Sequence, residues 1–262
     1  MSTPPVVLTI GGSDSSGCYG IHADLRALAS RGVHGASALT VITAQNTTGL
    51  HAAATVPLDL VEAQINAVLD DLTVVAVKTG MLGRVEVIEM LARLAAQGRL
   101  PHLVVDPVLV DRHGRALFGT DVSDAYRELL IPHATLTCPN VAEAALLAGM
   151  DPQRMHDPTE FIRHVGHSTI VTAGRSKGVD AIDLYWDGAE LVEFRAKRVA
   201  TTNNAGSGDA FTAHLAASLG GGRSVRQSIE EAKAHVHAAL VSAADWALGQ
   251  GPGPLDHLGW SR

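Results

Sequence analysis

The sequence predicts an α/β fold in which helices cover both faces of a doubly wound, mostly parallel β-sheet. Three observations support this prediction. Short β-branched runs alternate with amphipathic stretches along the chain, as in repeated strand–helix–strand units. The runs are almost continuously apolar, as strands buried on both faces of a sheet are. Polar residues and glycines follow the runs, where the ligand-binding edge of such a sheet lies.

The first half of the chain alternates strand and helix. Residues 6–10 (VVLTI) form a β-branched run that stops at two glycines, which predicts a buried strand. A helix is expected over 21–30 and a second strand over 36–44 (ASALTVITA). Residues 59–72 (DLVEAQINAVLDDL) have the apolar spacing of an amphipathic helix, and 74–80 (VVAVKTG) form the next apolar strand.

The alternation continues through the middle of the chain. A helix over 85–98 is expected to stop at its terminal glycine. Strands follow over 102–108 (HLVVDPV) and 134–140 (ATLTCPN), and then a short helix over 141–149 (VAEAALLAG).

The last third departs from this rhythm. Residues 181–199 predict two strands around Asp187-Gly188, a hairpin turn signal. Two long helices close the chain, from about Asp209 and about Val225. Because no linker, repeat or low-complexity tract interrupts the 262 residues, we expect a single domain over 1–262.

Composition narrows the function classes. The net charge of −7, without a basic cluster, argues against nucleic acid as a partner. There is no apolar run long enough for a membrane span and no secretory signal, so a cytoplasmic location is expected. Cys18 and Cys138 lack metal or redox spacing. Among the 13 histidines, His235 and His237 are two apart and diverge on a helix, so we expect no zinc site.

Polar and glycine residues follow five expected strands in succession. The segments are GGSDSSG, TAQNTTG, KTGM, DPV and CPNVAEA. In a parallel sheet these strand ends meet at one edge, which predicts a ligand cleft there. The first segment is neither a Walker A loop nor a dinucleotide-binding glycine motif.

A second glycine motif places a carboxylate where an anion would be expected. In TTNNAGSGDAF, residues 201–211, Gly206-Ser207-Gly208 precede Asp209 at the start of a helix. Exposed backbone N–H groups and the helix dipole make such a start attractive to phosphate. Asp209 is therefore either a helix N-cap or a general base beside a phosphate site.

These motifs together resemble the ribokinase-type small-molecule kinases. The segments GGSDSSGCYGIHADL, TAQNTTG and VKTGML are most similar to hydroxymethylpyrimidine/phosphomethylpyrimidine kinases, and VVDPV, PNVAEA and GSGDAF fit the wider group. The resemblance implies a ribokinase-like fold and transfer of a phosphoryl group from ATP, with Mg²⁺, to a primary alcohol. A small heteroaromatic molecule with a hydroxymethyl group is the implied acceptor, and a homodimer is the expected assembly.

The resemblance also implies roles for individual residues. Asp209 matches the catalytic base, beside an anion hole formed by the amides of Ala205, Gly206, Ser207 and Gly208 together with its own. The implied acceptor site comprises Gly12, Asp24, Gln45, Met81 and Val108, although Met81 and Val108 also suit core packing. The implied Mg-ATP site comprises Asp106, Asn140, Glu143, Thr172 and Gly174, with Asp106 and Glu143 near Mg²⁺, partly through water.

Four departures from the pyrimidine-kinase pattern bear on specificity. Cys18-Tyr19 replaces Gly-Ala, His22 replaces glutamine, Thr172 stands where lysine is common, and Asp209 stands where these kinases have cysteine. The changes at Thr172 and Asp209 resemble ribokinases and pyridoxal kinases. We therefore keep pyridoxal as an alternative acceptor, and expect an alcohol kinase with weak or absent activity on the monophosphate. A nucleotide-binding regulator without turnover is the alternative of another class.

Overall fold

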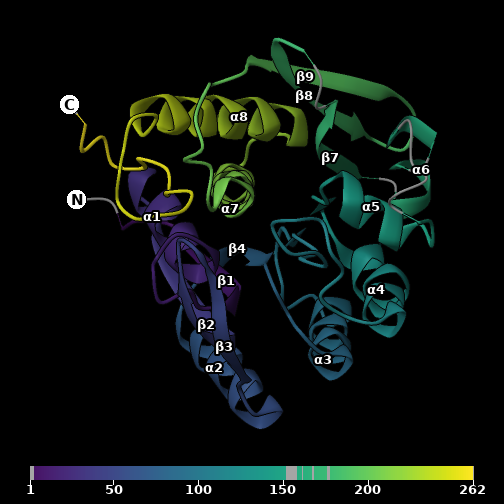
Figure 1. Cartoon of the computed structure of the whole chain (residues 1–262). Helices are drawn as coiled ribbons and strands as arrows, with labels where there is room; N and C mark the ends of the chain where they lie inside the picture. Colours follow the sequence, from purple (N-terminus) through teal and green to yellow (C-terminus); the bar gives the residue numbers. More distant parts are fainter. Residues whose placement is uncertain (1–2, 152–157, 161, 167, 176–177, 262) are drawn as a thin grey trace.

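The protein is built around one mixed β-sheet. The structure, a computed structural model, describes residues 3–151, 158–160, 162–166, 168–175 and 178–261. Within these residues the sheet has nine strands in the order β3-β2-β1-β4-β5-β6-β7-β8-β9 (Figure 1). Their bounds are β1 Val6–Gly12, β2 His34–Asn46, β3 Gly49–Thr55, β4 Val74–Thr79, β5 Val104–Val105, β6 Leu136–Thr137, β7 Thr169–Arg175, β8 Asp180–Trp186 and β9 Leu191–Lys197.

Helices cover both faces of the sheet. Their bounds are α1 Gly20–Ser30, α2 Leu58–Asp71, α3 Val85–Ala96, α4 Thr120–Ala125, α5 Val141–Leu147, α6 Ile162–Val165, α7 Ser207–Gly220 and α8 Val225–Ser242. The described residues also contain a π-helical turn over Tyr126–Leu130 and 3₁₀ turns over Ile131–His133 and Pro158–Glu160. None of the described helices combines the length and apolar composition that a membrane crossing requires.

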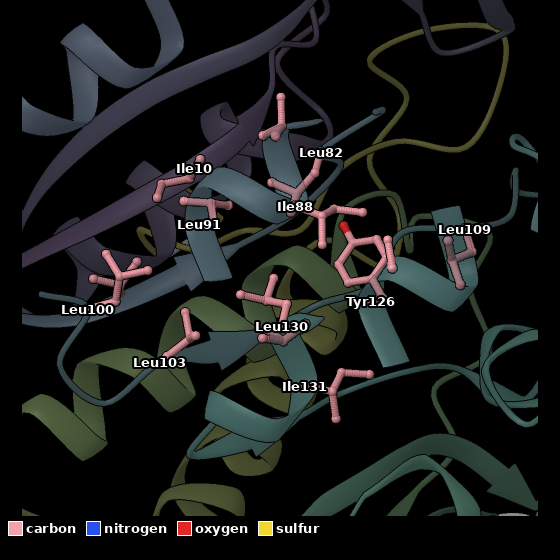
Figure 2. Packing of buried hydrophobic residues seen from close by; sticks show 14 of the residues in the cluster. Ile10, Leu82, Ile88, Leu91, Leu100, Leu103, Leu109, Tyr126, Leu130 and Ile131 are labelled. Atoms are coloured by element: carbon pink, nitrogen blue, oxygen red, sulfur yellow. The ribbon is translucent and has the colours of Figure 1, made fainter. Parts of the chain in front are cut away.

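Two hydrophobic clusters separate the helices into two layers. One cluster packs α2 to α6 against the sheet, and Figure 2 shows part of it around Leu91 of α3, Leu103 and Tyr126. The other packs α1, α7 and α8 against the opposite face, where Figure 1 shows α7 beside α8. This two-layer packing confirms the predicted doubly wound α/β architecture.

The strand order reverses between β1 and β4: β2 and β3 lie on one side of β1, and β4 and the later strands lie on the other. Strand β1 is parallel to β2 on one side and to β4 on the other, and the chain visits β2 before it crosses to β4. Strands β5, β6 and β7 continue the parallel series beyond β4. The carboxyl ends of these strands therefore share one edge, and the crevice at the reversal is where such folds bind ligands.

Several elements differ from the sequence predictions. Residues 49–55 had no assigned element, and they form β3, which pairs with β2 in an antiparallel hairpin. Residues 120–133 are helical and had no assigned element. The strands expected over 102–108 and 134–140 shrink to two residues each, because the polar ends of these segments turn away at the ligand edge. The predicted hairpin over 181–199 is confirmed as β8 and β9, and β8 also pairs with β7, a strand that was not predicted.

Candidate active site

The GSG motif forms the entry to helix α7. Gly206 is the N-cap residue and adopts a left-handed conformation with φ of 77°. A Cβ atom at this position would lie 2.1 Å from the carbonyl oxygen of Cys18 and 3.1 Å from the Cβ of Ala23. Only glycine therefore fits, because the loop before α1 packs directly on the start of α7.

The predicted anion hole is smaller than its five amides suggest. The N–H of Ala205 donates to Gly253 O at 3.1 Å, and that of Ser207 donates to Asn204 O at 3.1 Å. Among the described residues, the amides of Gly206, Gly208 and Asp209 have no such backbone acceptor. Since the first N–H groups of a helix lack intrahelical partners, these three remain as donors for an anion.

A buried lysine joins three carboxyl groups at the reversal point of the sheet. Lys78 lies near the end of β4, and its side chain is 1% exposed. Its Nζ lies 2.9 Å from Asp24 Oδ1, 3.4 Å from Asp209 Oδ1 and 3.8 Å from Asp106 Oδ2. Burial alone would lower the pKa of Lys78, but the carboxyl groups of Asp24, Asp209 and Asp106 outweigh it and raise the pKa. The three carboxyl groups thus favour the charged form of Lys78.

Asp24 lies beneath this site. Its side chain is 1% exposed, and its carboxylate accepts hydrogen bonds from Lys78 Nζ and from the hydroxyl of Thr9. Burial raises its pKa to about 7, although Lys78 opposes the shift. The sequence predicted that Asp24 holds the acceptor ring. That role stays a prediction, and in the structure the carboxylate of Asp24 contacts Thr9 and Lys78 below the site.

Apart from Asp24 in α1, the predicted acceptor residues lie at or just beyond the ends of β1, β2, β4 and β5. Gly12 is buried and Met81 half-buried, and a Cβ on Gly12 would lie 2.8 Å from Met81 Cε, so the two residues are in contact. The half-buried Gln45 is held by Ser15, whose hydroxyl donates to Gln45 O at 2.7 Å and accepts from Gln45 N at 2.8 Å. Val108 is half-buried, and its N–H donates to Asp106 O at 3.0 Å.

The loop over residues 13–19 connects this acceptor side to the glycine motif. Its Ser15 holds the end of β2, and its Cys18 carbonyl packs on Gly206. The carboxylate of Asp14 organises the loop, accepting hydrogen bonds from the N–H groups of Ser16, Cys18 and Tyr19 at 2.9 Å each. The loop thus contacts both the end of β2, which carries Gln45, and the first residue of the glycine motif.

The predicted nucleotide residues lie at the ends of β5, β6 and β7. Asp106 Oδ2 accepts from the Thr212 hydroxyl of α7 at 3.0 Å, and burial raises the pKa of Asp106 to about 6 against the effect of Lys78. Thr172 N donates to Pro139 O at 3.0 Å, which brings Thr172 beside Asn140. Gly174 lies in β7, whose backbone runs past the same edge.

Asn140 and Glu143 also have a structural role at the start of α5. They form a capping box, in which Asn140 Oδ1 accepts from Glu143 N at 3.0 Å and Glu143 Oε2 accepts from Asn140 N at 2.8 Å. Glu143 Oε1 further accepts from Leu109 N at 3.3 Å. Burial, and then the charge of Asp106, raise the pKa of Glu143 to about 8.

The carboxyl groups present suit a magnesium ion that arrives with a nucleotide. In the described part of the chain, no group of three or more His, Cys, Asp or Glu side chains is arranged to hold a metal ion. Mg²⁺ bound with nucleotides commonly takes one or two carboxylates and completes its shell with phosphates and water. Asp106, with a side chain 10% exposed, fits this use, whereas both oxygens of Glu143 already accept backbone hydrogen bonds.

Sequence reasoning missed Lys78. The signal was available, because a lysine inside the apolar run VVAVKTG must be buried if that run is a central strand. Lysine is almost never fully buried unless it is paired. A carboxylate partner was therefore to be expected nearby.

Comparisons with known proteins identify the family to which this site belongs. A family model described as phosphomethylpyrimidine kinase matches residues 14–256. The chain belongs to the phosphomethylpyrimidine kinase family. Its relatives include the hydroxymethylpyrimidine/phosphomethylpyrimidine kinase of Rhizobium meliloti (strain 1021), which is 43% identical, with 97% of each chain covered. This family membership confirms the predicted resemblance and the ribokinase-like fold.

Solved structures similar to this phosphomethylpyrimidine kinase family member include pyridoxal kinases. An ADP complex of Bacillus subtilis pyridoxal kinase has a TM-score of 0.89 at 34% identity, covering 97% of this chain and 98% of that chain. The pyridoxal kinase from Staphylococcus aureus in complex with AMP-PCP and pyridoxal has a TM-score of 0.87 at 29% identity, covering 100% and 96%. Kinases named for two different acceptors therefore share this fold.

Proposed function

We propose that the protein is an ATP-dependent kinase that phosphorylates the hydroxymethyl group of hydroxymethylpyrimidine, in thiamine synthesis or salvage. The observation that carries the proposal is the position of Asp209. Its carboxylate lies in the first turn of α7, within the cluster around Lys78 and beside the unpaired amides of the GSG motif. The chain also belongs to a kinase family, and its similar structures include complexes with ADP and with AMP-PCP.

Asp209 and the amides at the start of α7 have different roles in the proposed phosphoryl transfer. The acceptor hydroxyl oxygen attacks the γ-phosphorus of ATP while the bond from that phosphorus to the ADP oxygen breaks. Asp209 accepts the hydroxyl proton. The amides of Gly206, Gly208 and Asp209, together with the dipole of α7, stabilise the negative charge on the moving phosphoryl group.

Mg²⁺ is part of the proposal. When bound with the nucleotide it would neutralise charge on the phosphates. Asp106 is the residue placed to hold it, with Glu143 contributing through water. We further assign Asn140, Thr172 and Gly174 to the nucleotide side because they follow β6 or lie on β7 at the same sheet edge.

On the acceptor side, we assign the ring pocket to Gln45, Met81, Gly12 and Val108. The side-chain amide of Gln45 offers a donor and an acceptor together, which suits an aminopyrimidine edge. Pyridoxal is the second candidate acceptor, since the Staphylococcus aureus kinase was solved with pyridoxal and both acceptors are flat rings with a hydroxymethyl group.

The assembly and location follow as secondary proposals. We propose a homodimer, because β3 is an edge strand and the β2–β3 hairpin exposes Leu50 (55%) and Ile42 (53%), which a second copy would cover. The net charge of −7 supports a small-molecule partner rather than nucleic acid. A cytoplasmic location is proposed, where ATP is available. Sedimentation analysis of the purified chain tests the dimer, and a monomer at micromolar concentration would contradict it.

The acceptor assignment is tested by ADP release with Mg-ATP and a panel of ring alcohols. The panel contains hydroxymethylpyrimidine, pyridoxal and pyridoxine, with products identified by phosphorus NMR. We expect the highest kcat/KM with hydroxymethylpyrimidine. A higher value with pyridoxal would select the alternative acceptor, and no turnover with any alcohol would favour a nucleotide-binding regulator.

A further inference from the structure

Lys78 is placed where four elements of the fold meet. It projects from β4 at the point where the sheet order reverses, and a Cβ at Gly80 would lie 3.2 Å from its Nζ, so a side chain there would crowd the ammonium group. Its partners come from α1 (Asp24), from the end of β5 (Asp106) and from α7 (Asp209). The ammonium therefore lies between the predicted base and the predicted Mg-ATP carboxylate.

The contact with Asp209 is made from beneath the site. Lys78 is 1% exposed and Asp209 is 14% exposed, so the lysine meets the carboxylate from the protein interior. The other side of Asp209 is left for the acceptor. Because Lys78 is itself buried, we place it outside contact with the acceptor and the nucleotide.

Helix α7 also contacts the Asp106 carboxyl group directly. The Thr212 hydroxyl lies 3.0 Å from Asp106 Oδ2 and 3.1 Å from the main-chain oxygen of Asp209. Lys78 thus links the carboxyl groups of Asp106 and Asp209, and Thr212 adds a contact between the Asp106 carboxyl group and the first turn of α7. A carboxylate that is already held in position loses little further freedom when the reaction begins, and Lys78 holds that of Asp209.

An anionic base beside an anionic phosphoryl group poses an electrostatic problem. The γ-phosphate must approach the first turn of α7, where Asp209 already carries negative charge, and like charges at close range repel strongly in a partly buried site. A fixed cation on the inner side of the base offsets this repulsion.

We propose that Lys78 is a positioning residue that holds the Asp209 carboxylate in place and supplies its counter-charge during phosphoryl transfer. The proposal rests on the proposed function, since it takes Asp209 as the base. The acceptor proton moves to Asp209, the phosphoryl group moves to the acceptor oxygen, and Lys78 keeps its own proton throughout. A lysine that merely neutralised Asp24 would have no such link to Asp209.

A double-mutant cycle separates these two roles. The variants are Lys78→Met, Asp209→Asn and the double variant, with kcat, the KM of ATP and the unfolding midpoint measured for each. We expect Lys78→Met to lower kcat roughly tenfold or more while the KM of ATP changes by less than about threefold. In the Asp209→Asn background the same change should alter kcat by less than about threefold, because the charge that Lys78 serves is gone.

Loss of Lys78 alone leaves Asp24 buried and unpaired, which could prevent folding. The cycle is therefore repeated in an Asp24→Asn background, where the buried carboxylate is already neutral. The same pattern of non-additivity in the folded variants is expected there.

Two results would overturn the inference. One is an unchanged kcat in Lys78→Met, and the other is an equal loss of kcat in the presence and absence of the Asp209 carboxylate. Near-normal turnover of Asp209→Asn alone is a different outcome. It would show that Asp209 is not the base, so the mechanism in the proposed function would fail, and the inference about Lys78 would fail with it.

Discussion

Replacement of Gly206 by alanine tests whether the start of α7 is built as described. The position has φ of 77°, and a Cβ would meet the Cys18 carbonyl oxygen at 2.1 Å. A left-handed conformation costs a residue other than glycine about 1–2 kcal/mol. Forcing an extra carbon into a packed site costs about 1–3 kcal/mol more. Gly206→Ala should therefore lower the free energy of unfolding by about 2–5 kcal/mol.

Gly208→Ala is the matched control, two residues further along the same motif. Nothing lies within 4 Å of a Cβ at Gly208, which is in the first turn of α7. Alanine in a helix is favoured over glycine by about 0.5–1 kcal/mol, so this variant should be as stable as the parent or slightly more stable.

Urea unfolding followed by circular dichroism gives the midpoint and the slope for both variants, and an unchanged slope attributes the difference to stability. If Gly206→Ala stayed within about 0.5 kcal/mol of the parent, the usual range for a harmless surface change, the close approach of Cys18 to Gly206 would be wrong.

Three further outcomes are expected. Gln45→Ala should raise the acceptor KM roughly fivefold to a hundredfold, which corresponds to the loss of about 1–3 kcal/mol of hydrogen bonding to the ring. The KM of ATP should stay nearly constant in the same ADP-release kinetics. Equal changes in the two KM values would show that Gln45 does not line the ring pocket. Hydroxymethylpyrimidine monophosphate should have a kcat/KM at least about tenfold below that of the alcohol in phosphorus NMR assays. The reason is that the site holds three carboxyl groups and only the one ammonium group of Lys78, which disfavours an acceptor that is itself an anion. Comparable rates on the alcohol and the monophosphate would refute this. Burial, and then His235, lower the pKa of His214 to about 3, so the folded protein favours the neutral imidazole. The neutral form contributes fully to the free energy of unfolding above the unfolded pKa of 6.5, and this contribution is lost as the pH falls from there toward 3. His214→Leu should therefore lose less unfolding free energy than the parent between pH 7 and pH 5 in urea titrations, by about 1 kcal/mol or more, and parallel curves would contradict the assignment.

The parallel part of the fold could be predicted from the sequence because its strands carry strong local signals. Apolar runs such as 74–80 are buried on both faces and end in glycine or polar residues. Strand β3 could not be found in this way. Its sequence, GLHAAAT, is exposed and rich in alanine, and it is held by pairing with β2 rather than by its own preference for extended structure.

The helical segment over 120–133 carried a usable signal. Val122, Tyr126 and Leu130 are spaced by four and all three are buried, the pattern of one apolar helix face. The assignment was missed although the periodicity is present.

The candidate site could be predicted only in part. Asp209 was visible because glycines mark the start of a helix, and Asp106 because it follows an apolar strand. That both carboxyl groups contact the same lysine could not be predicted. The ion pairs join Lys78 of β4 to residues of α1, of α7 and of the loop after β5, and no local pattern encodes contacts between residues so far apart in the chain. The use of the Ala205 and Ser207 amides within the protein is likewise a property of the folded loop.

The most direct test of the central claim, that Asp209 is the general base, is the turnover of Asp209→Asn with hydroxymethylpyrimidine and Mg-ATP, measured beside its affinity for ATP. The substitution keeps the size of the side chain and removes its negative charge and its ability to take the hydroxyl proton. We expect ATP to bind with a Kd within about threefold of the parent, while kcat falls roughly a hundredfold or more. Turnover close to that of the parent would show that Asp209 is not the base, and would contradict the mechanism.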